Sequence, residues 1–395
     1  MRQGYLRLLD RLTGRGQISY MVVALKNRQR IGRLTPLDDV LLRIGERIHP
    51  VPTREMPPAF ALGSTLAQDI ISAGQHPAVP LALIDGWAVH AEATAGADAY
   101  AAAILSEIRE VAVGEPLGSH GDAVAPLDAV TLRGDKGEIQ VAVIPGEGVL
   151  MPGTDCSSGE VLRQAGHRLR AIDVAAIQAL GVAAVRVRKP RVRIARVGGG
   201  RNDIADAVAD WVAYAIAADV GEPVASRASA DVEALLTGGG VDAVTLVGGT
   251  GFGPRDDTVH ALARTGTVEA HGIAISPGET AAFGFANSRP VLLIPGRLDA
   301  ALAVWLLIGR NMLTRLRGGG ANEPSCESLP LTAKVASTVG LTELVLVRRV
   351  ADGIAPLASK YLPLAALAQA DGWIVVPAAS EGLPVGAQVI TRSLP

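Results

Sequence analysis

The sequence predicts a multidomain α/β protein. β-rich N-terminal domains precede an α/β domain with a mainly parallel sheet, and a small C-terminal β-barrel-like domain follows. A chain of 395 residues exceeds the usual size of one domain. Between 191 and 317, apolar runs alternate with helical patterns, as in a parallel sheet covered on both faces. At 72–165 and beyond 324, short apolar runs broken by Gly, Pro and Asp indicate small β modules.

The elements of the α/β part follow one another in a regular order. A helix is expected first over 35–48, with Thr35 as N-cap and Pro36 at the first helical position. A second helical pattern covers 171–180. Beyond it we expect strands at 191–197, 242–249 and 289–296, and helices at 203–220 and 299–316.

These patterns suggest a division into domains. An N-terminal extension, 1–33, precedes a linking domain that is interrupted by an inserted β-rich domain. The run RGGGANEP at 317–324 is typical of a linker. We therefore expect a linking domain at 34–72 plus 145–189, an insertion at 73–144, the α/β domain at 190–318 and the C-terminal domain at 325–395.

Composition excludes several classes of partner. Aromatic residues make up only 3% of the chain, too few for the stacking platforms of single-stranded nucleic acid. The formal net charge of −2 provides no general attraction to DNA, RNA or an anionic membrane. The longest clean apolar run, 300–308, is far below the ~20 residues that span a bilayer. An anionic substrate would therefore need local groups or a metal to hold it.

The N-terminus and the cysteines predict a cytoplasmic protein. Cys156 and Cys326 are far apart and lack metal-ligand spacing, so a disulfide framework is not expected. The histidines form no HExxH or HxxxH pair, so no zinc site is indicated. Residues 1–33 are Arg-rich without a long apolar segment, which excludes a secretory signal. A helix, a disordered arm, or a leader upstream of a start at Met21 all remain open for this segment.

The stretch LVGGTGFGPRDDT at 246–258 is the main candidate for a binding loop. It follows an apolar strand, and ligands of α/β sheets bind at the carboxyl ends of strands. Its glycines let backbone N–H groups approach an anion, and Asp256 and Asp257 can hold a magnesium ion that bridges to it. The alternative is a glycine turn closed by an aspartate, which is common in proteins.

Several motifs, in the same order along the chain, resemble the molybdopterin molybdenumtransferase family, which includes MoeA and the gephyrin E domain. GGTGFGPRDDT resembles the signature of the molybdopterin-binding fold, in a wording closest to the molybdopterin adenylyltransferases. The resemblance extends from about 36 to 389. Its other motifs are HPAVPLALIDGWAVHAEAT (76–94), HGDAVAPLD (120–128), GEVLRQAGHRLRAIDVAAIQALGVAAVRVRKPRVRIARVG (159–198), HGIAISPGETAAFG, LLIPGRLDAAL and ADGWIVVPA (370–378).

The resemblance implies a transferase of molybdenum cofactor biosynthesis. The family inserts molybdate into adenylylated molybdopterin with release of AMP, assisted by a divalent cation, here Mg²⁺. Asp256 and Asp85 would position that ion, with Asp257 as a further ligand. The loop residues Gly248, Gly249, Thr250 and Gly251 would cradle the pterin phosphate. The family resemblance also implies an elongated homodimer with sites built across subunits, and a molybdoenzyme or a cofactor-synthesis protein as a further partner.

The chain departs from the family at the positions that would face the family's anionic substrate. Lysines of the family are replaced by Ser276 and Glu279, a change that should cost several kcal/mol beside an oxyanion. A Thr-Gly-Asp-Glu motif is replaced by GGGR at 198–201, and an asparagine by Arg297. Arg255 and Arg297 can supply positive charge that the lysines supplied. We count Arg255, Ser276 and Arg297 among the candidate substrate-binding residues.

These departures leave two further functions open. The first is a catalytically weakened homologue that binds molybdopterin, or its cofactor, and carries it. The second is adenylyl transfer, which rests only on the wording of the 248–258 loop. It would require another upstream carboxylate, for which Asp231 is a poor candidate.

Overall fold

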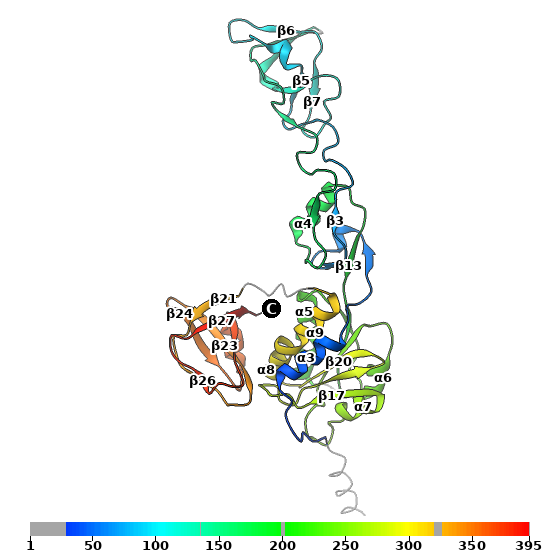
Figure 1. Cartoon of the computed structure of the whole chain (residues 1–395), viewed down its shortest axis with the longest axis vertical. Helices are drawn as coiled ribbons and strands as arrows, with labels where there is room; N and C mark the ends of the chain where they lie inside the picture. Colours follow the sequence, from blue (N-terminus) through cyan, green and yellow to red (C-terminus); the bar gives the residue numbers. More distant parts are fainter. Residues whose placement is uncertain (1–28, 135, 199–201, 320–325, 395) are drawn as a thin grey trace, which may run out of the picture.

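The computed structural model describes residues 29–134, 136–198, 202–319 and 326–394. These parts form an elongated molecule (Figure 1). Small sheets containing β5, β6 and β7 occupy one end, and α4, β3 and β13 lie in the middle. The α/β part occupies the other end, with the C-terminal sheet beside it. The predicted fold class is confirmed. Most of the predicted extension, and parts of the GGGR and RGGGANEP segments, lie outside the described residues.

A mixed six-stranded sheet forms the centre of the α/β part. Its order is β15-β14-β16-β20-β19-β17. The first four strands are mutually parallel, whereas the last two pair antiparallel. All five residues of β16 are buried, as its uninterrupted apolar sequence predicts. The bounds are β14 Arg191–Arg196, β15 Glu222–Ala225, β16 Ala243–Val247, β17 Gly266–His271, β19 Ala282–Ala286 and β20 Arg289–Ile294.

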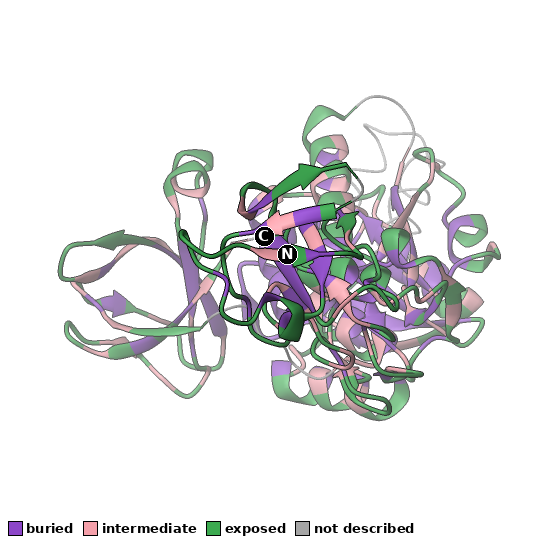
Figure 2. Cartoon of the chain, turned by 90° about the horizontal axis from the view of Figure 1, so that it is seen from above, coloured by how far each residue is buried: buried purple, intermediate pink, exposed green. Residues whose placement is uncertain are grey.

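Two hydrophobic clusters cover the two faces of this sheet. On one face, Val247 and Ile294 pack with α3, α5, α8 and α9. On the other, Val244 and Leu246 pack with α6 and α7. Figure 2 shows buried residues concentrated in the sheet and on the inward sides of the helices. The helices are α3 Leu37–Arg47, α5 Asp203–Ala218, α6 Val232–Thr237, α7 Thr258–Thr265, α8 Leu298–Val304 and α9 Arg310–Arg317.

The helix predicted over 299–316 contains a π-helical interruption, Trp305–Gly309, labelled η4. Trp305 is fully buried, and its Nε1 donates to Asp219 Oδ2 at 3.1 Å. A Cβ at Gly309 would lie 2.3 Å from the Trp305 ring, so only glycine permits this packing. Helical periodicity did not reveal this irregular turn, because it depends on one buried indole and its partner.

The predicted cap of the first helix is wrong by one residue. Pro36, rather than Thr35, is the N-cap of α3, and it makes no side-chain capping bond. Thr35 instead forms a parallel bridge with Ile273. Its N–H donates to Gly272 O at 2.8 Å, and its carbonyl accepts from Ala274 N at 2.8 Å. Both backbone groups are therefore used in pairing with a distant segment.

The N-terminal parts consist of several small sheets, each with few strands. The middle part surrounds α4 and has its own core, which includes Leu66, Leu169 and Ile177. The distal part has another, which includes Val89 and Ile139. The middle elements are β1 Arg54–Met56, β2 Thr65–Leu66, β3 Ile70–Ile71, β12 Val161–Arg163, α4 Ala171–Ala179 and β13 Val185–Arg188. The distal strands are β4 Leu81–Ala82, β5 Gly86–Val89, β6 Ala103–Leu105, β7 Arg109–Val111, β8 Ala123–Pro126, β9 Val130–Arg133, β10 Lys136–Ile139 and β11 Val149–Leu150.

The C-terminal part is a mostly antiparallel sheet. Its order is β18-β23-β25-β27-β21, with β24 paired to β23. β18 comes from the α/β part of the chain and pairs parallel with β23, which joins the two parts through backbone hydrogen bonds. The middle part and the C-terminal sheet each have a core of their own, but Leu37, Val40 and Ile44 of α3 pack in the core of the α/β part rather than with the middle part. The domain boundaries given above remain a prediction. The strands are β18 Ile275–Ser276, β21 Glu327–Pro330, β22 Val335–Ala336, β23 Thr342–Val350, β24 Gly353–Ala358, β25 Gly372–Val376, β26 Gly382–Leu383 and β27 Gln388–Ser393; α10 covers Leu364–Gln369.

No helix within the described ranges is long and apolar enough to cross a membrane. Cys156 is buried and Cys326 is exposed.

Candidate functional site

The glycine loop, residues 248–253, connects β16 to α7 at the carboxyl edge of the parallel strands. Gly248 and Gly249 adopt positive φ angles of 96° and 74°. A Cβ at Gly249 would lie 2.0 Å from Thr258 Oγ1. The loop therefore needs glycine at this position for both its backbone conformation and its packing.

Hydrogen bonds hold the loop carbonyls in place. Thr258 Oγ1 donates to Gly248 O at 3.1 Å, and Thr258 N donates to Gly249 O at 3.3 Å. Gln29 Nε2 donates to the carbonyls of Gly249 and Gly251, each at 2.9 Å. The remaining carbonyl, of Thr250, lies 3.3 Å from His271 Nε2. Each carbonyl from 248 to 251 thus has a partner.

The corresponding amides are left for a ligand. Within the described ranges, no group accepts a hydrogen bond from the amides of Gly249, Thr250, Gly251 or Phe252. In a trans peptide, the carbonyl of one residue and the N–H of the next point in opposite directions. Fixing four successive carbonyls therefore also fixes the orientation of each of these four amides. Such a series of N–H groups beside a helix start forms an anion-binding concavity.

His271 acts on the loop as a neutral donor. Burial lowers the pKa of His271 from its usual value, because desolvation disfavours the imidazolium form. The neutral ring can donate its Nε2–H to Thr250 O, which accepts only. Thr250 Oγ1 is also paired with Thr280 Oγ1 at 3.2 Å, so the single buried threonine of the loop is fixed through two atoms.

We expect the loop to become less ordered as the pH is lowered, because His271 becomes protonated. Its folded-state pKa lies below its unfolded-state pKa, about 6.5, so the unfolded chain binds more protons. This contribution to stability is present above that pH and is lost as the pH falls below it. Hydrogen-exchange protection of the Gly253 and Thr258 amides, which donate to Asp256 Oδ2 and Gly249 O, should therefore decrease from pH 7 to pH 5. His271→Gln, which donates without titrating, should flatten that dependence; an unchanged profile would contradict this role.

Asp256 closes the loop on its own backbone. Its Oδ2 accepts from Gly253 N at 2.7 Å. In the described parts of the chain, no donor is recorded for its other oxygen, Oδ1. One carboxylate oxygen beside the amides therefore remains able to bind a cation or a ligand.

Asp257 is already engaged by two basic side chains. Its oxygens lie 3.2 Å from His260 Nδ1 and 2.9 Å from Arg264 Nη2. The hydrogen bond that Arg264 donates to Asp257, followed by the one it donates to Glu233, raises the pKa of Arg264. Although Asp257 precedes α7, it makes no side-chain cap. These contacts disfavour the predicted role of Asp257 as a magnesium ligand.

The two candidate arginines differ in their surroundings. Arg255 is exposed, and no ion pair is recorded for it within the described residues. Arg297 binds both oxygens of Asp299, through Nε at 3.0 Å and Nη2 at 2.5 Å. Its guanidinium also lies 5.5 Å from the centre of the Tyr361 ring. The hydrogen bond to Asp299 is the largest cause of the raised pKa of Arg297, with a smaller contribution from Glu279. Arg297 is therefore partly neutralised, whereas Arg255 is not.

Ser276 and Glu279 occupy two different environments. Ser276 is 4% exposed, in the short strand β18 that pairs with the C-terminal sheet. Glu279 is half-buried, and its Oε2 accepts from Gly278 N at 3.0 Å. The next residue, Thr280, contacts the glycine loop through Thr250. The segment that contains Ser276 and Glu279 thus adjoins the loop.

The remaining candidate carboxylates lie elsewhere. Asp85 follows β4 in the distal part, where its Oδ1 accepts from Val113 N at 2.8 Å. β5 and α7 lie at opposite ends of the molecule, so one chain does not bring Asp85 to Asp256 (Figure 1). Asp231 caps α6 through Ala234 N at 3.0 Å, which leaves the adenylyl-transfer alternative without its upstream carboxylate.

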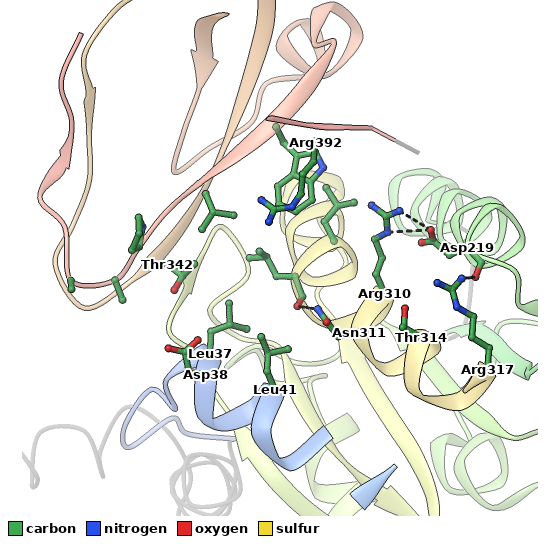
Figure 3. Close-up of a pocket in the computed structure, with 17 residues that line it drawn as sticks. Leu37, Asp38, Leu41, Asp219, Arg310, Asn311, Thr314, Arg317, Thr342 and Arg392 are labelled. Carbon is green, nitrogen blue, oxygen red and sulfur yellow. Dashed lines mark hydrogen bonds and ion pairs between the residues drawn. The ribbon is translucent and has the colours of Figure 1, made fainter. Parts of the chain in front are cut away.

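A cavity of about 560 Å³ lies away from the loop, between α3, α9 and the C-terminal sheet. Figure 3 shows Arg310 and Arg317 directed at Asp219. Arg310 Nη2 lies 2.9 Å from Asp219 Oδ1, and Arg317 Nη1 donates to Asp219 O at 2.8 Å. A third arginine, Arg392, lies 5.2 Å from the ring centre of Trp373. Because these arginines already have partners, the glycine loop is the better anion site.

Comparison with known proteins agrees with this arrangement. Residues 35–181 match the MoeA N-terminal region (domain I and II), and residues 201–315 match a probable molybdopterin binding domain. The chain is a distant homologue of the MoeA proteins. The second match contains the glycine loop, so the candidate site lies in the molybdopterin-binding part of this MoeA-like chain.

Relatives and solved structures give the same result. A putative molybdopterin biosynthesis protein of Methanocaldococcus jannaschii is 26% identical over 361 residues, covering 82% of this chain and 88% of the relative. Molybdopterin molybdenumtransferase 1 of Mycobacterium tuberculosis is 29% identical over 310 residues, covering 70% and 71%. The fold resembles the crystal structure of the molybdopterin biosynthesis MoeA protein from Pyrococcus horikoshii OT3, with a TM-score of 0.65 at 23% identity. That match covers 91% of this chain and all of the other.

The sequence did not identify three residues that shape the loop. Gln29 lies in the segment whose role the sequence left open. His271 and Thr258 lie at the edges of two of the quoted motifs, at 271–284 and 248–258, but neither was singled out as a site residue. Thr258 could have been found from its position, since it follows an Asp-Asp pair at the start of a helical pattern. The contacts of Gln29 and His271 depend on tertiary structure, so no local signal indicates them.

Proposed function

We propose that this MoeA-like protein is a molybdopterin molybdenumtransferase, which inserts molybdate into adenylylated molybdopterin and releases AMP. The observation that carries the proposal is the row of four amides, at the carboxyl edge of β16, that find no acceptor in the described part of the chain. Backbone donors at a helix start favour phosphate. The terminal phosphate of molybdopterin is the proposed ligand. The curated relatives named for this activity support the reaction.

The residues present fit a magnesium ion held jointly with the substrate. Magnesium commonly uses one or two carboxylates together with substrate phosphates and water. Asp256 offers one such oxygen, Oδ1. The described ranges contain no group of three or more His, Cys, Asp or Glu residues placed to hold a metal. When bound, the ion would offset phosphate charge, and Asp256 would orient it.

The second candidate is a carrier that binds molybdopterin without turning it over. Glu279 favours it, because a carboxylate at a lysine position repels the oxyanion that a transferase must capture. Arg297 gives only partial compensation, since Asp299 already binds it.

Titration separates these two functions. The purified protein is titrated by calorimetry with molybdopterin and with its adenylylated form, with and without Mg²⁺. Magnesium-dependent binding of the adenylylated form, followed by AMP release on addition of molybdate, supports the transferase. Tight binding that is indifferent to Mg²⁺, without AMP release, supports the carrier. Absence of binding to either pterin contradicts both.

We further propose that the working protein is a homodimer in which Asp85 of one subunit completes the site of the other. Asp85→Ala and Asp256→Ala should each inactivate the protein. Mixing the two variants after dissociation should restore about a quarter of wild-type AMP release, because half the dimers are mixed and each has one intact site. Mixing two samples of Asp85→Ala is the control. No recovery in the mixed sample, despite exchange of subunits, would contradict a shared site.

A further inference from the structure

The first described residue of the chain, Gln29, is inserted beneath the glycine loop. It is 1% exposed, although it precedes the first helix and lies 220 positions from Gly249. Buried polar side chains are rare unless their hydrogen-bonding groups are satisfied. The contacts of Gln29 therefore indicate what it does.

All the polar groups of the Gln29 side chain are used on one small region. Its Nε2 donates to Gly249 O and Gly251 O, each at 2.9 Å. Its Oε1 accepts from Val259 N at 2.7 Å. Val259 is the second residue of α7. One amide thus connects two loop carbonyls to the start of the following helix, with both donors and the acceptor satisfied.

The segment that carries Gln29 is itself fixed. Ile31 packs so closely over Gly272 that a Cβ there would lie 2.4 Å from the isoleucine. Thr35 then pairs with Gly272 and Ala274 through its backbone. Gln29 is only a few residues from Ile31 and Thr35 along the chain. Because those two residues are fixed against 272–274, the side-chain amide of Gln29 is held beneath the loop.

We propose that Gln29 is a positioning residue that sets the direction of two of the four anion-binding amides. Its bond to Gly249 O turns the N–H of Thr250 outward, and its bond to Gly251 O turns the N–H of Phe252 outward, because each pair shares one trans peptide. Without this restraint, the glycines permit the peptide planes to rotate. A carbonyl would then face the anion and repel it. The choice of molybdopterin phosphate as the anion rests on the proposed function.

Exchange of single amides tests the restraint itself. Gln29→Met keeps the approximate volume of the side chain without its donors, and Arg30→Ala changes the exposed neighbour as a control. In Gln29→Met, the Val259 amide should exchange at least about tenfold faster, since it loses its acceptor. Exchange at Val244 and Leu246 in β16 should not change. Equal exchange of Val259 in Gln29→Met and in the wild type overturns the proposal.

Binding tests the consequence for phosphate. The dissociation constants of molybdopterin and of its dephosphorylated form are measured for each variant. Gln29→Met should weaken molybdopterin about tenfold and leave the dephosphorylated pterin unchanged, whereas Arg30→Ala should affect neither. Equal weakening of both pterins indicates a general structural role and overturns the proposal. Tighter binding of molybdopterin also overturns it, because Gln29 would then obstruct the site.

The two proposals fail in different ways. If the wild-type protein binds neither pterin, the proposed function fails, and the exchange of Val259 still decides whether Gln29 holds the loop. If the wild type binds molybdopterin and Gln29→Met binds it equally well, the proposed function stands and the role of Gln29 is rejected.

Discussion

Replacing Gly249 with alanine should weaken molybdopterin binding by about a hundredfold or more. The added Cβ would lie 2.0 Å from Thr258 Oγ1, so the Thr258 side chain would have to move and lose its hydrogen bond to Gly248 O. The φ of 74° adds a cost of about 1–2 kcal/mol for any L-residue with a Cβ. The loop must therefore move, and its amides lose the orientation that would let them bind the phosphate. Calorimetric titration with molybdopterin measures the effect.

Gly239→Ala is the matched control for this substitution. Gly239 lies in the same domain, and a Cβ there would meet nothing within 4 Å. Its alanine variant should bind molybdopterin like the wild type. Equal affinity of Gly249→Ala and Gly239→Ala would show that the glycine loop does not hold the ligand.

Substitutions at Asp256 should separate its two roles. Asp256→Asn retains an oxygen that can accept from Gly253 N, so the loop should keep its conformation while the charge is lost. This variant should bind molybdopterin normally but lose the effect of Mg²⁺ on the adenylylated form. Asp256→Ala loses the loop contact as well and should weaken both pterins, by about tenfold to a hundredfold.

A surface aspartate provides the control for charge. Asp210 is exposed on α5, with no ion pair recorded in the described ranges. Asp210→Ala should leave both affinities and the magnesium effect unchanged. A magnesium effect of wild-type size in Asp256→Asn would exclude Asp256 as the residue that holds the ion.

Local patterns predicted the α/β class and several of its elements, but not β15, β17, β19, α6 or α7. The apolar runs at β14, β16 and β20 and the helical spacing of α5 describe single elements, and burial on both sides of the sheet requires this kind of sequence. Thr35 shows the limit of such patterns. Its sequence neighbours suit a helix cap, but pairing with residues 272–274 determines its backbone.

The part of the candidate site that lies in one continuous stretch was predictable from the sequence, and the part contributed by distant residues was not. The glycines of the loop and Asp256 act within one continuous stretch, so their spacing indicates their structure. Gln29 and His271 act on that loop from far along the chain, and no local pattern reports such contacts. The engagement of Asp257 by His260 and Arg264, one helical turn and two turns away, could have been anticipated from i,i+3 and i,i+7 spacing.

Two of the charged residues that depart from the expected family pattern, Glu279 and Arg297, lie near one another in the structure. Glu279 makes a minor Coulombic contribution to the raised pKa of Arg297, so the two charges are close enough to influence one another. Restoring lysine at Ser276 and Glu279 together would therefore leave Arg297 with less neutralising charge. That double variant distinguishes a weakened transferase, which should gain AMP release, from a protein in which these positions do not face the substrate.

The direction of the loop amides is the central claim, and NMR of the protein labelled with ¹⁵N-glycine tests it most directly. On titration with molybdopterin, the amide resonances of Gly249 and Gly251 should shift as they bind the phosphate, while that of Gly239 stays in place. The dephosphorylated pterin should leave Gly249 and Gly251 largely unshifted. Saturating molybdopterin that moves neither loop glycine would contradict the account.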